Sequence, residues 1–277
     1  MELLATISPW ATLQTFFLAF LLVYLFSYFL LFGRWGPRSR PFASSCFTSL
    51  AHGTPAAVTA AIATRGSPPP WHRAAYASPN TALHDTVLEF SIAYFLIDLI
   101  HYLVFFPSDV LFIIHHLVTL FVLLTCRYVV AHGAHAILLL LILAEVTSPC
   151  QNTWSLAKAR KAEAPFAARF FRVMSPIFFT FYTVVRGVVA PAYVCDLVMY
   201  YSMEDVEDSI PKWAWVSWAV IMGSGILVSL LWVLNNWKVW YRDQRSFDVQ
   251  KKMGKRVGVP NVLLSTYRIE WVSDGIN

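Results

Sequence analysis

Charged residues are scarce in this 277-residue chain, because Lys, Arg, Asp and Glu together make up 13% of it, whereas soluble domains carry about 25%. Hydrophobic residues make up 57%, and the mean hydropathy is +0.56. This shortage of charge excludes an ordinary soluble domain. A spanning helix needs about 20 apolar residues, so the length leaves room for roughly six or seven spans and for no separate soluble domain.

Cysteine is scarce too. The four residues Cys46, Cys126, Cys150 and Cys195 share no close spacing, which excludes a disulfide framework and a cysteine-based zinc site, and we expect no metal. The chain also lacks an Asn-x-Ser/Thr acceptor, so nothing marks a glycosylated lumenal loop. It shows no internal repeat, which disfavours the inverted-repeat transporters.

Nucleic acid is not the expected partner, although the formal net charge is +5. The basic residues lie in loops beside apolar runs, where anionic lipid headgroups attract them. We therefore expect membrane lipids as partners, and the sequence leaves the oligomeric state open.

Long apolar runs are abundant, and they predict an all-α integral membrane protein with about seven spans. The first run has three arginines after it and no basic residue before it, which predicts an uncleaved anchor helix rather than a signal peptide. The second run is weaker because it is rich in Ala, Ser and Thr. The predicted spans cover residues 12–32, 42–63, 87–106, 112–130, 136–149, 172–197 and 213–237.

These boundaries divide the chain into an anchor helix at 1–39, a bundle of six transmembrane helices around a polar cavity at 40–240, and a basic cytoplasmic tail at 241–277. Pro149 is expected to end the fifth span early, and residues 155–164 are expected to form a basic surface helix. With the N-terminus outside, most cytoplasmic segments are basic and the acidic loop at 204–208 lies on the opposite side. The positive-inside rule thus predicts a lumenal N-terminus and a cytoplasmic C-terminus.

Ionisable residues inside apolar spans are the strongest functional signal, because lipid cannot hydrogen-bond a polar side chain. The most informative are the adjacent His115 and His116 in the fourth span. The predicted topology brings Asp98 and His101 of the third span, and Glu145 of the fifth, to a similar depth near the cytoplasmic face. We therefore predict that these residues form one functional site.

The two adjacent histidines cannot share one role. His115 lies on the same helix face as Thr119, whereas His116 points about 100° away from His115. One ring is therefore expected to face a substrate while the other packs or bonds to a carboxylate.

Other polar residues could line the same site or simply hold helices together. Tyr94, Asp98 and His101 share one face because their spacing is i, i+4, i+7. His101 could instead reach the headgroups, and His52 could be a helix–helix hydrogen bond rather than a lining residue. Arg186, in the middle of the sixth span, needs a partner, either a carboxylate of this cluster or a lipid phosphate.

The motifs occur in a fixed order along the chain: Ser49-Leu50-Ala51-His52, Tyr94-Phe95-Leu96-Ile97-Asp98, Ile114-His115-His116-Leu117-Val118-Thr119, Glu145-Val146-Thr147-Ser148-Pro149, and Phe181 through Arg186 to Pro191. This series resembles the TLC-domain family, the superfamily of the ceramide synthases and their relatives. The resemblance covers roughly residues 40–240 and implies a TLC-type bundle.

The resemblance also implies a chemistry. Ceramide synthases move a fatty-acyl group from its CoA thioester to a sphingoid amine, and their double His and two later aspartates are essential. Here His115 and His116 match the double His, Glu145 stands in place of the first aspartate and Ser148 in place of the second, so one acid is missing. The chain is therefore more similar to the smaller TLC-domain branch, whose members are associated with membrane lipid composition.

We expect the catalytic groups to be His115, His116, Asp98 and Glu145. The residues expected to bind lipid or substrate are His52, Tyr94, His101, Thr119, Ser148, Asn152 and Arg186. Two functions stay open, namely acyl transfer to a lipid amine or hydroxyl, with acyl-CoA as co-substrate and no bound cofactor, and non-catalytic regulation of membrane composition or trafficking by lipid binding. A seven-span carrier or receptor is disfavoured because the polar cluster lies at shallow depth. The resemblance makes the endoplasmic reticulum the expected membrane.

Overall fold

The computed structural model describes residues 9–65, 73–204 and 206–257, and over these residues the chain is almost entirely helical. One isolated β-bridge joins Pro79 to His132. The helices are α1 (Pro9–Phe26), α2 (Ser39–Ala63), α3 (Ala82–Phe105), α4 (Val110–Leu124), α5 (Ala134–Glu145), α6 (Ser148–Arg160), α7 (Pro165–Val184), α8 (Ala190–Met203) and α9 (Lys212–Val257).

Six helical segments of the described chain are long and apolar enough to cross a membrane, which supports an all-α integral membrane protein. They are Thr12–Leu31, Ala82–Phe105, Val110–Val130, Ala134–Arg160, Pro165–Met203 and Lys212–Arg242. Three of them contain a π-helical stretch, at Ser27–Leu31, Thr125–Val130 and Val185–Val189. Such stretches are rare in helices and occur often at functional sites.

Helix α2 corresponds to the second predicted span, and it is not among these six apolar segments. It has 25 residues, which is long enough to cross a bilayer. It packs against α1, α3, α5 and α6, so little of it faces outward. Its Ala, Ser and Thr residues suit a helix that is enclosed by protein, because small side chains allow close approach and hydroxyls can bond across helices.

Two predicted helix starts are wrong. Helix α5 ends at Glu145, so the helix of the fifth span does end before Pro149. The surface helix predicted at 155–164 is α6, which begins at Ser148 and ends at Arg160, because Pro149 lies in its first turn, where a missing N–H removes no helical hydrogen bond. Helix α7 begins at Pro165 rather than at Arg172, because basic residues limit entry into lipid and not helix formation. Helix α9 continues to Val257, whereas its apolar segment ends at Arg242, so the first part of the segment predicted as a basic tail is helical.

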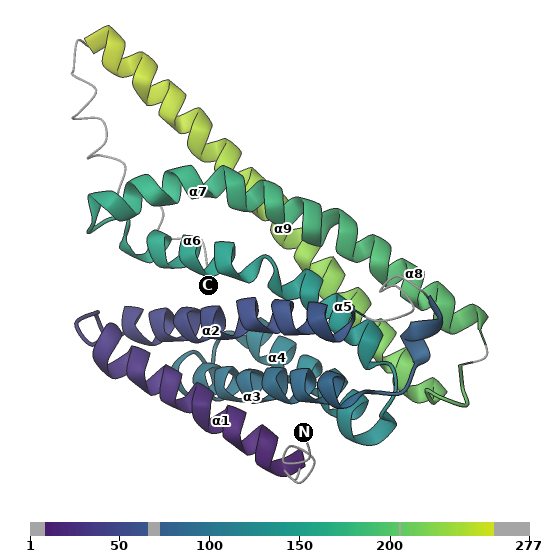
Figure 1. Ribbon diagram of the computed structural model, residues 1–277. Coiled ribbons are helices and arrows are strands. Elements are labelled where there is room, and N and C mark those ends of the chain that lie inside the picture. The colour runs from purple at the N-terminus through teal and green to yellow at the C-terminus, as the bar shows by residue number, and fades with distance from the viewer. Residues whose placement is uncertain (1–8, 66–72, 205, 258–277) are drawn as a thin grey trace.

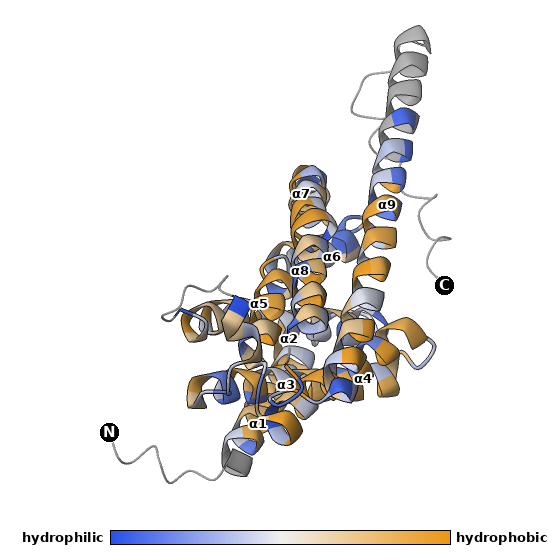
Figure 2. Ribbon diagram, turned by 90° about the vertical axis from the view of Figure 1, so that its right-hand side faces the viewer, coloured by the Kyte–Doolittle hydropathy of each residue, from blue (hydrophilic) through white to orange (hydrophobic). Residues whose placement is uncertain are grey.

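The contacts between helices close into a ring with α1 outside it, and Figure 1 shows α1 alongside α3. Contacts join α2 to α3, α3 to α4, α4 to α9, α9 to α7 and α8, α7 to α6, and both α5 and α6 back to α2. The predicted bundle of six helical segments after the anchor is thus present. Helix α1 packs on the outer side of α3, and apolar residues cover much of α4, α7 and α9 (Figure 2).

One end of the ring is held by an ion network and a tight turn. Arg127 Nε donates to Glu89 Oε1 at 2.9 Å, and Arg127 Nη1 lies 3.3 Å from Asp85 Oδ2. Glu89 is only 2% exposed, and a carboxylate so buried requires such a partner. The predicted turn before α5 is formed with Gly133 at φ +84°. This end is remote from His115, which lies near the start of α4.

Candidate functional site

Asp98 of α3 is the centre of a buried hydrogen-bond cluster that joins three helices. Ser45 of α2 donates to its Oδ1 at 2.7 Å. Tyr94, one turn earlier on α3, donates to Oδ2 at 3.3 Å, and His116 Nε2 of α4 lies 2.9 Å from the same oxygen. Asp98 and His116 are each 4% exposed. The predicted approach of Asp98 to the histidine pair is therefore present in the structure.

Both ring nitrogens of His116 face acceptors. Nδ1 lies 2.7 Å from the carbonyl oxygen of Phe112, and Nε2 faces the Asp98 carboxylate. A neutral imidazole has only one N–H, so both bonds form when the ring is an imidazolium, or when Asp98 itself carries the extra proton. In either form one proton lies between the two groups and the pair has no net charge. His116 has no nitrogen left for another partner.

His115 is the accessible member of the pair. Its side chain is exposed, and within the described residues it makes no hydrogen bond. Its ring stands at 84° to that of His116, with centroids 5.5 Å apart, and it contacts the edge of Phe95. The two histidines thus differ in the way that helical phase predicted.

Glu145, at the end of α5, belongs to a second cluster against α2. Ser148 donates to its Oε2 at 2.6 Å, and His52 Nδ1 lies 3.9 Å from its Oε1. Ser148 is therefore a hydrogen-bond donor to the Glu145 carboxylate. Gly53 makes this packing possible, because a Cβ there would lie 2.8 Å from Glu145 Oε2 and from Ser148 Cβ.

His52 and Tyr94 connect the two clusters. Their rings stack at 4.0 Å with an interplanar angle of 7°, and His52 Nε2 lies 3.2 Å from Ser91 Oγ. The charges of both Asp98 and Glu145 act on His52. The polar interior of α2, α3, α4 and α5 is thus a continuous arrangement.

Comparison with known proteins identifies the family. Residues 42–238 match the profile of the TLC domain. The chain belongs to the TLC-domain family. A TLC domain-containing protein of Arabidopsis thaliana is 49% identical over 240 residues, which cover 86% of this chain and 93% of the plant protein. No solved structure gives a significant match.

Arg186 lies in the π-helical stretch between α7 and α8 of the TLC domain. Its Nη2 donates to the carbonyl oxygen of Ala144 at 2.6 Å, its guanidinium stands over the Tyr182 ring at 5.7 Å, and its charge acts on His115. Its Nε is buried without a hydrogen-bond partner. No carboxylate of the described residues lies within 4.0 Å of it, so the ion pair considered above is not formed with Glu145 or Asp98.

The remaining predicted residues of the TLC domain have separate positions. His101 is 3% exposed and faces outward from the ring to Tyr24 of α1, whose hydroxyl lies 2.8 Å from its Nδ1, so it does not reach the headgroups. Asn152 donates to Ser49 Oγ at 2.9 Å and ties α6 to α2. Thr119 is half-buried and is not brought into either cluster.

Sequence reasoning missed two serines of α2, although a signal was present. Ser45, Ser49 and His52 have the spacing i, i+4, i+7 and therefore share one helix face. That face lies against Asp98, Asn152 and Glu145. A polar stripe on a weakly apolar span indicates a helix that faces the protein interior.

The described residues contain no group of three His, Cys, Asp or Glu arranged to hold a metal ion. Two pockets of the described residues lie away from the histidine pair. One of about 420 Å³ lies between α1 and α3 and is lined in part by His101, and one of about 270 Å³ lies between Trp35, α6 and α7. Neither of these two is lined by His115 or His116, and the His115 side chain is exposed.

Proposed function

We propose that this TLC-domain protein transfers an acyl group from acyl-CoA to an amine or hydroxyl of a membrane lipid, with His115 as the residue that contacts the reacting atoms. The observation that carries the proposal is the exposed, unbonded imidazole of His115 beside a buried His116–Asp98 pair. An imidazole with a free nitrogen can act as a general base, and its contribution is typically about 10²–10⁴-fold.

The reaction requires one proton transfer in each direction. His115 takes the proton of the lipid amine or hydroxyl as the new bond to the acyl carbon forms, and it returns that proton to the CoA sulfur as the carbon–sulfur bond breaks. His116 contacts no substrate in this scheme. It positions His115 through the helix they share and adds no net charge, because Asp98 compensates it.

Arg186 is the group suited to the negative charge of the reaction. Its charge acts on His115, and its buried Nε has no partner among the described residues. A guanidinium in a dry site stabilises an oxyanion strongly, because little solvent screens it. We propose that it faces the acyl oxygen of the tetrahedral intermediate.

The experiment is untargeted lipidomics of membranes that contain the intact chain, His115→Ala, His115→Gln or His116→Gln. His132→Ala, in the turn at the opposite end of the ring, is the matched control. Both His115 variants are expected to lose the product that the intact chain and His132→Ala make. Addition of labelled acyl-CoA to the same membranes then tests whether label enters that product. A product unchanged in both His115 variants would overturn the proposal.

Non-catalytic lipid binding is the second candidate, and a specific observation favours it. Asp98 and His116 use their polar atoms in bonds within the protein, Glu145 Oε2 accepts from Ser148, and Ser148 supplies no second acid. A regulator of this kind needs the shape and hydrogen bonding of the site but no proton transfer near pH 7. It predicts that His115→Gln keeps the wild-type lipid composition, whereas the enzyme predicts its loss.

The topology proposed with this function is a lumenal N-terminus and a cytoplasmic C-terminus in the endoplasmic reticulum. The start of α4 would then lie near the cytoplasmic face, where acyl-CoA is available. A glycosylation acceptor added before Pro9 should be modified, and one added after Val257 should not. The reverse pattern would contradict this orientation.

A further inference from the structure

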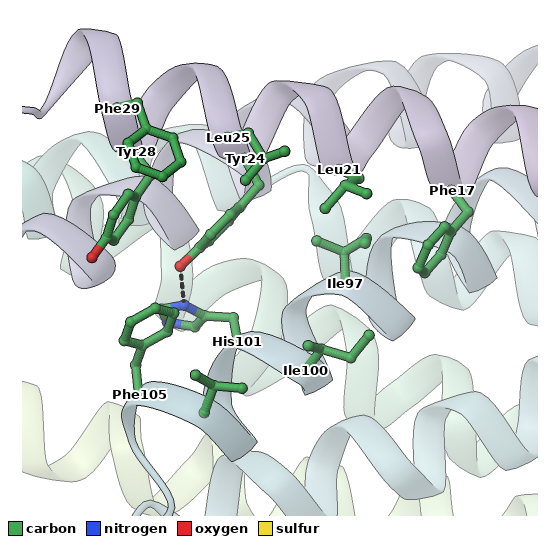
Figure 3. A pocket seen from close by; sticks show the side chains of 11 residues that line it. Phe17, Leu21, Tyr24, Leu25, Tyr28, Phe29, Ile97, Ile100, His101 and Phe105 are labelled. Carbon is green, nitrogen blue, oxygen red and sulfur yellow. Dashed lines mark hydrogen bonds between the residues drawn. The ribbon is translucent and has the colours of Figure 1, made fainter.

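A narrow apolar groove runs between α1 and α3 on the outside of the ring (Figure 3). Its volume is about 420 Å³. One wall is formed by α1 and the π-helical stretch that follows it, and the other by α3. The first wall is lined by Phe17, Leu21 and Phe29, and the second by Ile97, Ile100 and Phe105. The groove is separate from His115 and takes no part in the proposed acyl transfer.

A buried polar contact holds the two walls of the groove together. The Tyr24 hydroxyl lies 2.8 Å from His101 Nδ1, and Figure 3 shows this bond bridging α1 and α3 between the apolar side chains. Both residues are at most 9% exposed. In lipid such a bond has no water to compete with it, so the groove is formed before any ligand enters it.

The groove has the length of one leaflet. From Phe17 to Phe29 the helix rises about 18 Å, and half of a hydrocarbon core is about 15 Å. The groove therefore begins about a quarter of the way along the span at Thr12–Leu31, ends near its C-terminal end, and is slightly longer than one leaflet is thick. A helix of a partner, about 10 Å across, would need on the order of 1,000 Å³ over this length, whereas a single acyl chain is much thinner.

The end of the groove is basic. Tyr28 lines the groove, and the guanidinium of Arg40 stands over its ring at 5.4 Å. Arg40 Nη2 donates to the carbonyl oxygens of Gly33 and Trp35, its Nε is buried without a partner, and no described carboxylate is paired with it. Arg34 and Arg38, in the turn between α1 and α2, are exposed and make no ion pair with a described carboxylate. The sequence contains no Asp or Glu between Glu2 and Asp85. Asp109 and Glu163 lie at the same end of the ring, but Glu163 is paired with Arg160.

We propose that this groove binds one acyl chain of an anionic glycerophospholipid, whose phosphate lies against Arg34, Arg38 and Arg40. The length of the groove selects a chain within one leaflet, and the uncompensated arginines at headgroup depth select a negative charge. Each basic residue near the membrane surface contributes about 1 kcal/mol of attraction to anionic lipid.

The test uses the full chain purified in detergent with equal amounts of dioleoylphosphatidylglycerol and dioleoylphosphatidylcholine, and native mass spectrometry counts the lipids retained. Leu21→Trp fills the groove from α1, and Leu22→Trp, at a position 66% exposed outside the groove, is its matched control. Ile100→Trp fills the groove from α3, and Leu103→Trp is the control there. The intact chain and both controls are expected to retain phosphatidylglycerol, and the two groove-filling variants to lose it.

A charge variant tests the headgroup part. The double variant Arg34→Gln/Arg38→Gln is expected to lower the ratio of retained phosphatidylglycerol to phosphatidylcholine at least about tenfold. Arg242→Gln, an exposed arginine of α9, should leave that ratio unchanged. Equal retention of both lipids by the intact chain would overturn the proposal. Retention of phosphatidylglycerol by both groove-filling variants would also overturn it. A dimer of the intact chain that is lost only in those two variants would show that a second copy, and not a lipid, occupies the groove.

Discussion

His116 Nε2 and Asp98 Oδ2 lie 2.9 Å apart between α4 and α3, and this contact separates the roles of the two adjacent histidines. His116 is buried and uses both nitrogens, whereas His115 is exposed and uses neither. In this TLC domain the double His is one structural residue and one accessible residue.

Removal of Asp98 should strongly destabilise the bundle. Asp98→Ala leaves the His116 ring facing an acceptor on one side only and removes the partner of a buried charge, for which the expected loss is about 3–5 kcal/mol. Chemical unfolding in detergent, followed by far-UV circular dichroism, measures it. The double variant Asp98→Asn/His116→Gln should lose less unfolding free energy than Asp98→Asn and His116→Gln lose in sum. Strict additivity would contradict a direct pair, and His115→Gln should unfold like the intact chain.

Gly53→Ala should disturb the Glu145 cluster. The added Cβ would lie 2.8 Å from Ser148 Cβ, which cannot move without shifting the start of α6. The expected loss of unfolding free energy is about 1–3 kcal/mol. Gly225→Ala in α9 is the matched control, because no atom lies within 4 Å of a Cβ there, and alanine favours a helix over glycine. Equal effects of the two substitutions would refute the close packing of α2 on α5 and α6.

Arg127→Met should cost about 3–5 kcal/mol, because it leaves Glu89 buried without its main partner. Arg73→Gln removes the ion pair between Arg73 and Asp196, two side chains that are far more exposed than Arg127 and Glu89. This substitution should lower the unfolding free energy by at most about 1 kcal/mol. Thermal unfolding of the two variants in the same detergent checks this order. A larger loss for Arg73→Gln would contradict it.

Stability at alkaline pH should depend on Tyr76, which lies in the loop before α3. Burial and then the carboxylate of Asp196, 3.2 Å from its hydroxyl, raise the pKa of Tyr76 to about 12. Because this value exceeds the pKa of about 10 in the unfolded chain, the native state keeps the proton longer, and the stability from Tyr76 is lost as pH rises from about 10 to about 12.

The comparison that tests this is the melting temperature of the intact chain and of Tyr76→Phe across that range. The intact chain should be more stable near pH 9, and the difference between the two should shrink as the pH approaches 12. Two parallel curves would show that Tyr76 does not titrate in this way.

The local sequence pattern was sufficient to predict much of the fold and part of the candidate site. Apolar runs longer than a bilayer is thick form helices wherever they occur, since lipid leaves backbone groups no other partner. For the same reason Asp98, His116 and Glu145 could be recognised as costly residues, and helical phase alone required His115 and His116 to diverge. Charge patterns were poorer guides to helix ends, as Arg172 and the tail within α9 show.

Only the tertiary structure decided which partner each polar group has. It turned His115 outward and His116 onto Asp98, made Ser148 a donor to Glu145, enclosed α2, and left Arg186 bonded to a backbone carbonyl of α5. These outcomes depend on which helix faces lie together in the ring. Helical periodicity places a side chain on a face, but the neighbour it meets there is determined by packing between segments distant in the chain.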